Sequence, residues 1–372
     1  LHVPVEFHPG AVHVHHALFG HAVNIGRRCG HDDHDILFTH GEFLCLFIDL
    51  NAAVNVLSFG TRKDNKFYTF ELNVRSDVST DIPKDIFSLL KLGGTRDDRY
   101  VIKNTALNTT NYVELVGGYS NQLDNNWRLG GRVHLIAGIA DASITVPEAI
   151  ADVSGDLAID ASGTINLHAG KLKLPTTPDG YVDLDKDIKL NQLGIGGFGA
   201  AADFGAAYRS DKWIVDLSVL DLGAIYWSQG NVAEANYSGT VSIDDFDPAT
   251  LFKVTDTADS KMLGLSPRIN AGARYRIFPA LSAGVLGTVR AGRYSWYETR
   301  AGLTYTPGSF FSIAATGGVN SYGPCFGAAL NLNVACFNLY LGTDSIMTSF
   351  SPQLIPINKM HTRLTAGLVV SL

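Results

Sequence analysis

The feature that most constrains this chain is an alternation of apolar and polar residues with a period of two. Between residues 44 and 56 every even position is Leu, Ile, Ala or Val, while Asp49, Asn51 and Asn55 occupy odd positions. Residues 68–78 repeat the pattern, with Thr, Glu, Asn, Arg and Asp at the odd positions. Because successive side chains of a β-strand point to opposite faces, this period predicts strands with one apolar and one polar face.

The connections between the alternating segments are of two kinds. Short turn signals join segments in pairs, at 62–65, 123–126, 210–212, 278–280, 307–309 and 334–335. The connections between pairs are mostly longer, at 79–106, 141–192, 229–266 and 344–359. A regular exchange of short and long connections is typical of a transmembrane β-barrel, which has short periplasmic turns and long extracellular loops.

Counting the alternating segments gives the expected number of membrane spans. The predicted spans are 12–25, 44–62, 66–78, 107–122, 126–140, 193–209, 212–228, 267–277, 281–292, 298–306, 310–320, 324–333, 336–344 and 360–372. The predicted fold is therefore all-β, a transmembrane antiparallel β-barrel of about 14 strands with long extracellular loops, in one domain over residues 1–372. An even count places both termini on one side of the bacterial outer membrane, which we expect to be the periplasmic side.

Two connections leave room for further elements. Residues 157–159 and 164–168 have the composition of a short hairpin, and a hairpin that enters the membrane raises the strand count to sixteen. In residues 83–92, Ile86, Leu89 and Leu90 have helical spacing and predict a short amphipathic helix in an external loop.

Composition and charge narrow the partners. The chain has 29 Lys and Arg against 36 Asp and Glu, a net charge of −7, which offers no overall attraction to nucleic acid. Its most hydrophobic stretch, residues 43–59, is interrupted by Asp49, Asn51 and Asn55, so no segment has the length and apolarity of a membrane-spanning helix. The expected partners are outer-membrane lipid and other envelope proteins.

The polar face of the strands carries the more informative residues. In residues 267–277, Arg268, Asn270, Arg274 and Arg276 share one face, and apolar residues occupy the other. A membrane barrel turns its apolar face to lipid and its polar face to the lumen. The alternative is a soluble barrel that solvates these arginines. In the C-terminal strand the membrane interpretation places Leu364, Ala366, Leu368 and Val370 against lipid.

Charges of opposite sign concentrate in the two parts of the chain. Residues 266–372 contain eight Lys and Arg but two Asp and Glu, so the first 265 residues hold the excess of acid. On the lumen face this predicts a charge network of Glu71, Asp77 and Glu114 with Arg274, Arg276, Arg290 and Arg300. Charges crowded into a lumen usually pair, and paired charges fill space, so the sequence predicts an occluded or narrow lumen.

Histidine is concentrated in the N-terminal segment 1–43, which holds nine of the twelve His residues. On a strand His13 and His15 point the same way, and His31 and His34 in a following loop supply further nitrogen ligands of the kind zinc prefers. The alternative is a merely polar segment in the lumen or a loop.

A second candidate metal site is acidic. Asp179, Asp183, Asp185 and Asp187 alternate along one predicted loop, and carboxylate oxygens suit calcium. The spacing does not match an EF-hand, because Ile188 and Gly194 replace its required Gly and Glu. The alternative is a solvated acidic loop. We therefore expect no cofactor, with a calcium or zinc ion as the open alternative.

Signals for catalysis are absent from the sequence. No Gly-x-Ser-x-Gly motif occurs, and His134, the histidine best placed in the lumen, has no assignable serine partner. The glycine-rich run 194–199 lies in a β-alternating segment, so close strand packing explains it better than phosphate binding. We expect a protein that is not an enzyme.

Several runs of residues resemble a known family. These are 56–60 (Val-Leu-Ser-Phe-Gly), 70–75 (Phe-Glu-Leu-Asn-Val-Arg), 82–87 (Ile-Pro-Lys-Asp-Ile-Phe) and 217–223 (Leu-Ser-Val-Leu-Asp-Leu-Gly). They look like the uncharacterised outer-membrane β-barrel proteins of Bacteroidota, and the likeness covers most of residues 44–372. Those proteins are similar in plan to the long-chain fatty acid transporter superfamily of fourteen-stranded barrels. The resemblance implies a porin-like membrane protein and supplies no catalytic residues.

Two function classes follow from these patterns. A lumen filled by paired charges favours an accessory or structural subunit of an envelope protein complex, whose outer wall and loops bind other proteins. The alternative is a transport channel for a small or amphipathic solute. Conductance in planar bilayers separates the two classes.

Overall fold

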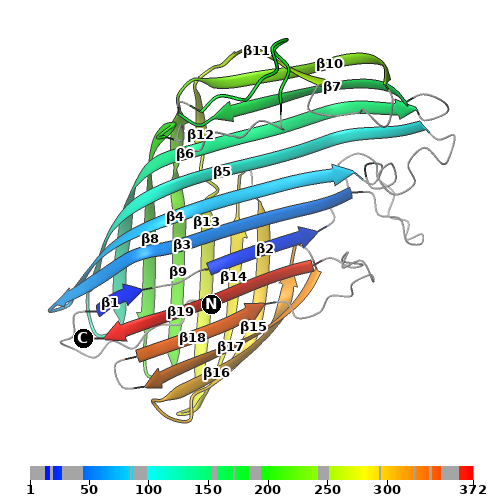
Figure 1. Cartoon of the computed structure of the whole chain (residues 1–372). Coiled ribbons are helices and arrows are strands. Elements are labelled where there is room, and N and C mark those ends of the chain that lie inside the picture. The colour runs from blue at the N-terminus through cyan, green and yellow to red at the C-terminus, as the bar shows by residue number, and fades with distance from the viewer. Residues whose placement is uncertain are drawn as a thin grey trace.

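The structure is a computed structural model of the 372-residue chain. It describes residues 13–16, 20–26, 45–83, 86, 99–152, 157–170, 172–183, 194–241, 251–292, 295–321, 323–334, 337–344 and 360–371. In this part of the chain almost all regular structure is β-strand, and every strand pairing is antiparallel (Figure 1).

The strands have the following bounds: β1 His13–His16, β2 Gly20–Gly26, β3 Cys45–Lys63, β4 Lys66–Pro83, β5 Arg99–Gln122, β6 Trp127–Asp152, β7 Leu157–His168, β8 Gly197–Arg209, β9 Trp213–Trp227, β10 Gly230–Val241, β11 Phe252–Ala258, β12 Lys261–Gly264, β13 Arg268–Phe278, β14 Leu281–Arg290, β15 Trp296–Tyr305, β16 Phe311–Asn320, β17 Gly323–Val334, β18 Phe337–Asp344 and β19 Met360–Ser371. The first two short strands, β1 and β2, both pair with β3 and with β19. They therefore occupy one place in the sheet, as the single predicted span 12–25 does.

The pairings close on themselves. From β2 the order of neighbours is β3, β4, β5, β6, β8, β9 and then β13 to β19, and β19 pairs again with β2. Each of these fourteen strands has a neighbour on both sides. Closure satisfies the backbone hydrogen bonds of every wall strand without a free edge, which a lipid environment requires.

The fourteen-strand prediction is confirmed, since each of the fourteen predicted spans coincides with one position in the ring. The alternative count of sixteen is wrong. Residues 157–168 form one continuous strand, β7, rather than a hairpin. This strand pairs with the far part of β6 and with β10, outside the ring.

Side-chain exposure identifies the two faces of the wall. Leu135, Phe198 and Val285 are among the exposed large hydrophobic residues, whereas Glu114 and Asp203, which alternate with such residues along the strands, are buried. Apolar side chains therefore point outward and polar ones into the lumen, the reverse of a soluble barrel. The protein is a transmembrane β-barrel.

The turns that follow β3, β5, β8, β13, β15 and β17 lie at one end of the barrel, which we call the turn end. The opposite end is the loop end, where short connections also join β14 to β15 and β16 to β17. Aromatic pairs lie near the turn end, with ring centroids 5.4 Å apart for Tyr68 and Tyr119 and 5.2 Å apart for Trp127 and Tyr208. Aromatic side chains of this kind gather at membrane interfaces. His13 pairs with Ser371 and with Gly60, so β1 begins and β19 ends at the turn end of the barrel.

In the C-terminal strand β19, the pairing agrees with the prediction that the even-numbered residues face lipid. Ala366 pairs with Leu341, which is 47% exposed on β18, and the neighbouring Gly367 is buried against Tyr340. The side chains of Leu364, Leu368 and Val370 lie outside what the structure describes.

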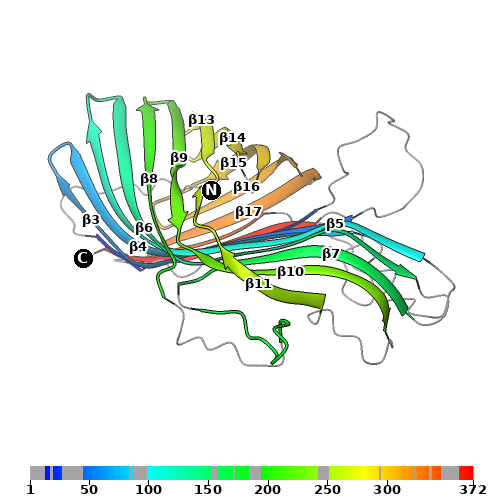
Figure 2. The ribbon, with the colours of Figure 1, turned by 90° about the horizontal axis from the view of Figure 1, so that it is seen from above.

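At the loop end the same sheet continues beyond the ring, in a part that we call the extension. The far parts of β5 and β6 pair over residues 99–111 and 140–152, and β7, β10 and β11 follow in order at their side. Figure 2 shows these strands reaching well beyond the barrel. Much of the two long connections 141–192 and 229–266 is therefore strand rather than irregular loop.

The extension has small apolar cores of its own. One contains Tyr100, Ala151, Ile159 and Ala161, and another places Val182 of the segment 172–183 against Ala233 of β10. The predicted amphipathic helix falls largely outside the described residues, although Ile86 has helical conformation. Among the described residues, the structure contains no helix with the length and apolarity to cross a membrane.

Candidate functional site

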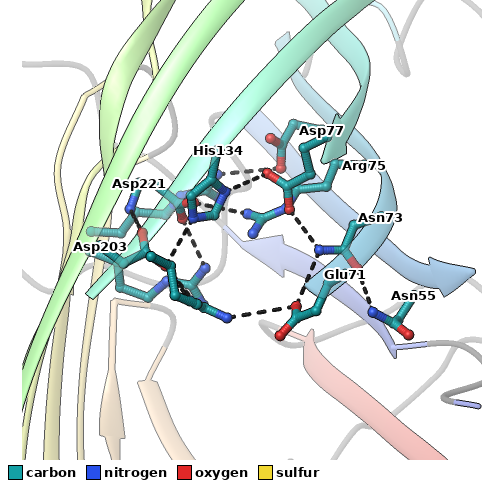
Figure 3. A network of polar contacts seen from close by, with 12 residues as sticks. Asn55, Glu71, Asn73, Arg75, Asp77, His134, Asp203 and Asp221 are labelled. Carbon is teal, nitrogen blue, oxygen red and sulfur yellow. Dashed lines mark hydrogen bonds and ion pairs between the residues drawn. The ribbon is translucent and has the colours of Figure 1, made fainter. Parts of the chain in front are cut away.

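The inner faces of β3 to β6, of β8 and β9 and of β13 and β14 meet in a buried polar network (Figure 3). Because the strands alternate with a period of two, every second residue of a strand points into the lumen. On β4 these residues are Glu71, Asn73, Arg75 and Asp77, and on β5 they include Glu114. Curvature of the wall brings side chains from distant strands together.

A histidine between two carboxylates forms the centre of the network. Nδ1 of His134 on β6 lies 2.9 Å from Oε2 of Glu114, and Nε2 lies 3.1 Å from Oδ2 of Asp203 on β8. The contact to Asp203 is too bent for a good hydrogen bond, so it is mainly electrostatic. The side chains of His134 and Glu114 are each 1% exposed.

Arginines neutralise both carboxylates from the other side. Arg75 Nε donates to Glu114 Oε1 at 2.9 Å and Arg75 Nη1 lies 3.1 Å from Oδ1 of Asp221. Arg132 Nη2 lies 2.5 Å from Oδ2 of Asp203, and its Nη1 is 3.8 Å from Glu71. Charges of alternating sign thus run from one side of the lumen toward the other.

A local irregularity of β9 places Asp221 in this network. The pairing of β8 with β9 shifts between Ala202 and Phe204, and Asp221 has a positive φ of 59°. A bulge of this kind redirects a side chain, and Asp tolerates the left-handed conformation better than most residues. The Asp221 backbone N–H donates to Oδ1 of Asp203 at 2.8 Å, and Arg268 Nη2 lies 3.3 Å from Asp221 Oδ2.

Of the seven residues predicted for the lumen network, the structure brings some together. Arg290 Nη2 lies 3.3 Å from Oδ1 of Asp77, joining β14 to β4, and Arg290 also bonds to Asn51. Arg300 instead lies 2.5 Å from Glu298 on its own strand. Arg276 is exposed near the turn end and has no salt bridge to a described residue.

The centre of the network was missing from the predicted set. Arg75, Arg132, His134, Asp203 and Asp221 were not included, although strand parity already assigns Arg75 and His134 to the lumen face. Asp221 has no such signal, since only the bulge in β9 turns it inward. Opposite charge alone does not indicate which residues lie at the same height in a closed barrel.

Beside the network, toward the loop end, lies a layer of buried apolar side chains. It comprises Tyr112, Ile136, Ala201, Ile225 and Trp227, and we call it the apolar layer. Trp227 is fully buried, at 0% exposure. Two glycines make room for its indole ring, because a Cβ at Gly138 would lie 2.7 Å from Cη2 of Trp227, and one at Gly197 would lie 3.0 Å from Cε3.

The segment from β12 to β13 completes this layer. Leu263 and Leu265 pack against the buried apolar residues, and β12 pairs with the end of β9. Lys261 Nζ at the start of β12 lies 2.6 Å from Oδ2 of Asp141 on β6, a carboxylate with 0% exposure. Thr110 also donates to Asp141, at 2.7 Å. This ion pair ties β12 to β6.

A small pocket separates the two layers. It is lined by Asp77, Tyr112, Asp221, Arg290 and the chain from Leu263 to Ser266, and its free volume is about 20 Å³. That is room for about one water molecule. The pocket has both charged and apolar walls because it lies between the network and the apolar layer.

The candidate metal ligands are mostly outside the described part. The structure gives the backbone but not the side chains of His13 and His15, and His31 and His34 lie outside the described residues. Asp179 is exposed in the segment 172–183, which also contains Asp183, whereas Asp185 and Asp187 are outside. Among the side chains described, no group of three or more His, Cys, Asp or Glu is arranged to hold a metal ion.

The sequence profile of one protein family matches most of the wall. It spans residues 46–344 of the 372, and the family is described as a family of unknown function, DUF5723. The chain belongs to the DUF5723 family. No curated protein matches this DUF5723 sequence. The origin in Bacteroidota that the resemblance implies stays a prediction.

Solved structures show the same fold at very low sequence identity. The DUF5723 barrel is similar to the Pseudomonas putida toluene transporter TodX, with a TM-score of 0.50, 10% identity and coverage of 98% of this chain and 90% of that chain. For the Ralstonia pickettii toluene transporter TbuX the TM-score is 0.51 at 7% identity, with 98% and 90% coverage. These likenesses establish the architecture of the barrel.

Proposed function

We propose that this DUF5723 protein is a gated transport channel of the bacterial outer membrane for a small, apolar or amphipathic solute. The observation that carries the proposal is a closed fourteen-stranded ring with an apolar outer wall and a polar lumen. The toluene transporters TodX and TbuX share this architecture, which supports transport over the accessory role that the sequence favoured. The identity of the solute is left to experiment.

The lumen has the layers that a gate needs. The polar network opposes the passage of an apolar solute, because a solute that displaces it leaves charges without partners. The apolar layer next to it opposes the passage of ions, since its mainly hydrocarbon side chains replace little of their hydration. Two different barriers in series keep the resting channel shut to both classes of molecule. Transport then requires that the β12 segment and Trp227 move.

We place the turn end in the periplasm and the loop end outside the cell. Short turns on the periplasmic side and longer connections outside are the rule for outer-membrane barrels. The chain from β3 to β13 follows this rule, with tight turns at one end of the barrel and the extension at the other. The first and last described strands would then both end in the periplasm.

Replacement of Trp227 tests the gate. In liposomes that contain the purified protein, Trp227→Ala should raise the uptake of a labelled monoaromatic hydrocarbon severalfold, because it removes the largest fully buried side chain from the apolar layer. It should also lower the free energy of unfolding by about 3–5 kcal/mol through the cavity it leaves. Trp213→Ala is the matched control, since Trp213 is 47% exposed on the outer wall. Equal uptake by both variants and by empty liposomes contradicts a transport role.

A second candidate function is an accessory subunit of an envelope protein complex. The extension favours it, because β7, β10 and β11 extend the sheet beyond the barrel where other proteins can reach it (Figure 2). Co-purification after gentle solubilisation, compared between the full protein and a barrel with a disrupted extension, tests this candidate. A partner protein that co-purifies with the full protein but not with the barrel whose extension is disrupted would support the accessory role.

We also propose that the protein is not an enzyme. His134 is held between two carboxylates that are themselves bound to arginines, so its nitrogens are already occupied. A general base needs a free nitrogen within reach of a nucleophile or substrate. Hydrolysis of ester or phosphate substrates by the purified protein, abolished in His134→Gln, would contradict this proposal.

A further inference from the structure

The turn end of the barrel carries positive charge that the chain as a whole does not. Residues 60–68, 119–130, 206–214 and 274–282 hold eight Lys or Arg and three Asp, in a chain with a net charge of −7. All of these segments meet at the turn end, on the β3 to β14 side of the ring. The charge of the barrel therefore differs between the turn end and the rest of the chain.

Arg62, Arg128 and Arg209, on β3, β6 and β8, point into the lumen. Arg128 lies between Trp127 and Leu129, which are 45% and 43% exposed on the outer wall. The side chain of Arg128 therefore points to the opposite face, into the lumen. Arg209 follows Tyr208, whose ring packs at a tilt against Trp127 on the outer wall. Arg62 pairs with Phe67, and its neighbour Thr61 pairs with the outward Tyr68.

The three arginines lie at the same height on one face of the wall. Arg62 is level with Gly130, because Phe67 and Ser120 continue the row of paired residues across β4 and β5, and Arg128 pairs with Ala207, two residues from Arg209. The side chain of Arg128 donates to the amide oxygen of Gln122 at 3.4 Å, and Arg62 Nε donates to the backbone oxygen of Asp64 at 3.2 Å. Within the described residues no carboxylate lies at salt-bridge distance from any of the three.

The nearby aspartate of the β5–β6 turn is committed elsewhere. Oδ1 of Asp124 accepts the backbone N–H groups of Asn126 and Trp127 at 2.8 and 2.7 Å. These bonds lower the pKa of Asp124, so it stays ionised but is held on the turn. It stabilises the turn rather than neutralising the arginines.

We propose that Arg62, Arg128 and Arg209 form a binding site for a small oxyanion, a carboxylate or a phosphate group, inside the turn-end mouth of the lumen. Like charges gathered on a lumen face repel unless an anion joins them, and the guanidinium fork matches the geometry of these oxyanions. The lumen-facing direction places the site in contact with the aqueous mouth rather than with lipid. It therefore takes a dissolved anion or the anionic end of a solute, not a lipid headgroup from the bilayer.

The small residues around the arginines leave space for such a ligand. Ser120 on β5 pairs with Gly130, which is two residues from Arg128 on β6, and Ala207 on β8 pairs with Arg128. A Cβ at Gly130 would lie 2.9 Å from Cβ of Ser120, so a larger residue at position 130 would crowd the neighbouring strand. The Ser120 hydroxyl is a further donor on the same face.

Inorganic phosphate is the probe for this site. The folded protein in an uncharged detergent is titrated with phosphate, and separately with chloride at the same ionic strength, while its thermal unfolding is followed. We expect a saturable rise in Tm with phosphate and none with chloride, because a ligand that binds only the folded state stabilises it. In Arg128→Gln and Arg209→Gln the Kd for phosphate should rise about tenfold or more.

Lys63→Gln provides the matched control. Lys63 neighbours Arg62 and carries the same charge, but it has the opposite parity and lies at the turn, so its loss should leave the Kd unchanged within about a factor of two. Arg128→Lys keeps the charge and loses the fork, which covers the case in which a Gln variant fails to fold. An equal response to chloride, or an unchanged Kd in the Arg128 and Arg209 variants, overturns the proposal. Because the readout is binding, it does not depend on whether the channel transports.

Discussion

At the scale of single residues, the important question is how the polar network balances its charges. Among the described residues, five carboxylates, of Glu71, Asp77, Glu114, Asp203 and Asp221, face four guanidinium groups, of Arg75, Arg132, Arg268 and Arg290. A carboxylate can only accept, so each His134 nitrogen that faces one is stabilised as an N–H. We therefore expect His134 to be doubly protonated, so that its imidazolium supplies a fifth positive charge.

Replacement of His134 should weaken the barrel more than replacement of another buried histidine. We expect His134→Gln to lower the free energy of unfolding by about 3 kcal/mol, because two buried carboxylates lose one positive charge. His168→Gln is the control: His168 is 2% exposed, but its Nδ1 contacts only the backbone oxygen of Ser228, at 2.8 Å. That change should cost about 1 kcal/mol. Urea titration in lipid vesicles measures both.

The imidazolium assignment has its own readout. Nitrogen NMR of labelled His134 should show two protonated ring nitrogens at neutral pH, whereas a single protonated nitrogen would contradict the charge balance. Equal stability losses in the two His variants would show that the pair of contacts at 2.9 and 3.1 Å adds nothing beyond packing.

At the scale of elements, strand irregularities decide where the lumen is filled. The bulge in β9 turns Asp221 inward, and the interruption between β12 and β13 lets residues 263–266 line the small pocket. Regular strands could not place Asp221 and Leu265 in the same region of the lumen. Bulges near functional sites commonly redirect a side chain in this way.

The ion pair of Lys261 with Asp141 should hold the β12 segment in its closed position. Lys261→Met leaves the fully buried Asp141 carboxylate with the Thr110 hydroxyl as partner, and we expect a loss of about 2–3 kcal/mol in the free energy of unfolding. The open probability of the channel in planar bilayers should increase as well.

A matched pair on the surface gives the control for this change. Lys103 and Glu148 are 3.3 Å apart with side chains 61% and 51% exposed, so Lys103→Met should cost less than about 1 kcal/mol. It should leave the open probability unchanged. If Lys261→Met behaves like Lys103→Met, the β12 segment is not held by this ion pair.

At the scale of the whole molecule, the exposed apolar wall has meaning only in a membrane. Side chains such as Val133, Leu135, Phe198 and Phe204 are 58–66% exposed, which a soluble protein of this size would avoid in a continuous band. Lipid removes the cost of exposing them and adds a cost for charge at the same positions. The closed ring and the polar lumen are explained by the same lipid environment.

Two exposed leucines separate the membrane setting from a soluble one. Leu135 is 61% exposed on the barrel wall and Leu123 is 57% exposed in the turn between β5 and β6. In lipid vesicles Leu135→Arg should lower the free energy of unfolding by about 2–4 kcal/mol, and Leu123→Arg by about 0–1 kcal/mol. Equal, small effects of both changes in vesicles would mean that Leu135 does not face the bilayer interior.

The strands, their faces and their number were determined by the sequence itself. Alternation with a period of two and short polar turns are local signals, and closure needs only neighbouring strands to pair in order, so the span 12–25 and the thirteen that follow could be read directly. The same local rule misled at residues 157–168. Gly163 is a hairpin signal in sequence, but β6 and β10 provide pairing partners on both sides and keep the segment extended.

Which charges meet inside the barrel was decided only by the tertiary structure. Parity places Asp77, Arg290 and Arg300 in the lumen, but it gives neither the height of a residue along the tilted strands nor the partner that curvature brings opposite to it. Asp77 thus reaches Arg290 from β4 to β14, while Arg300 stays with Glu298 on its own strand. The physical reason is that a salt bridge depends on separations of a few ångströms, which are set by the closure of the whole ring rather than by local pattern.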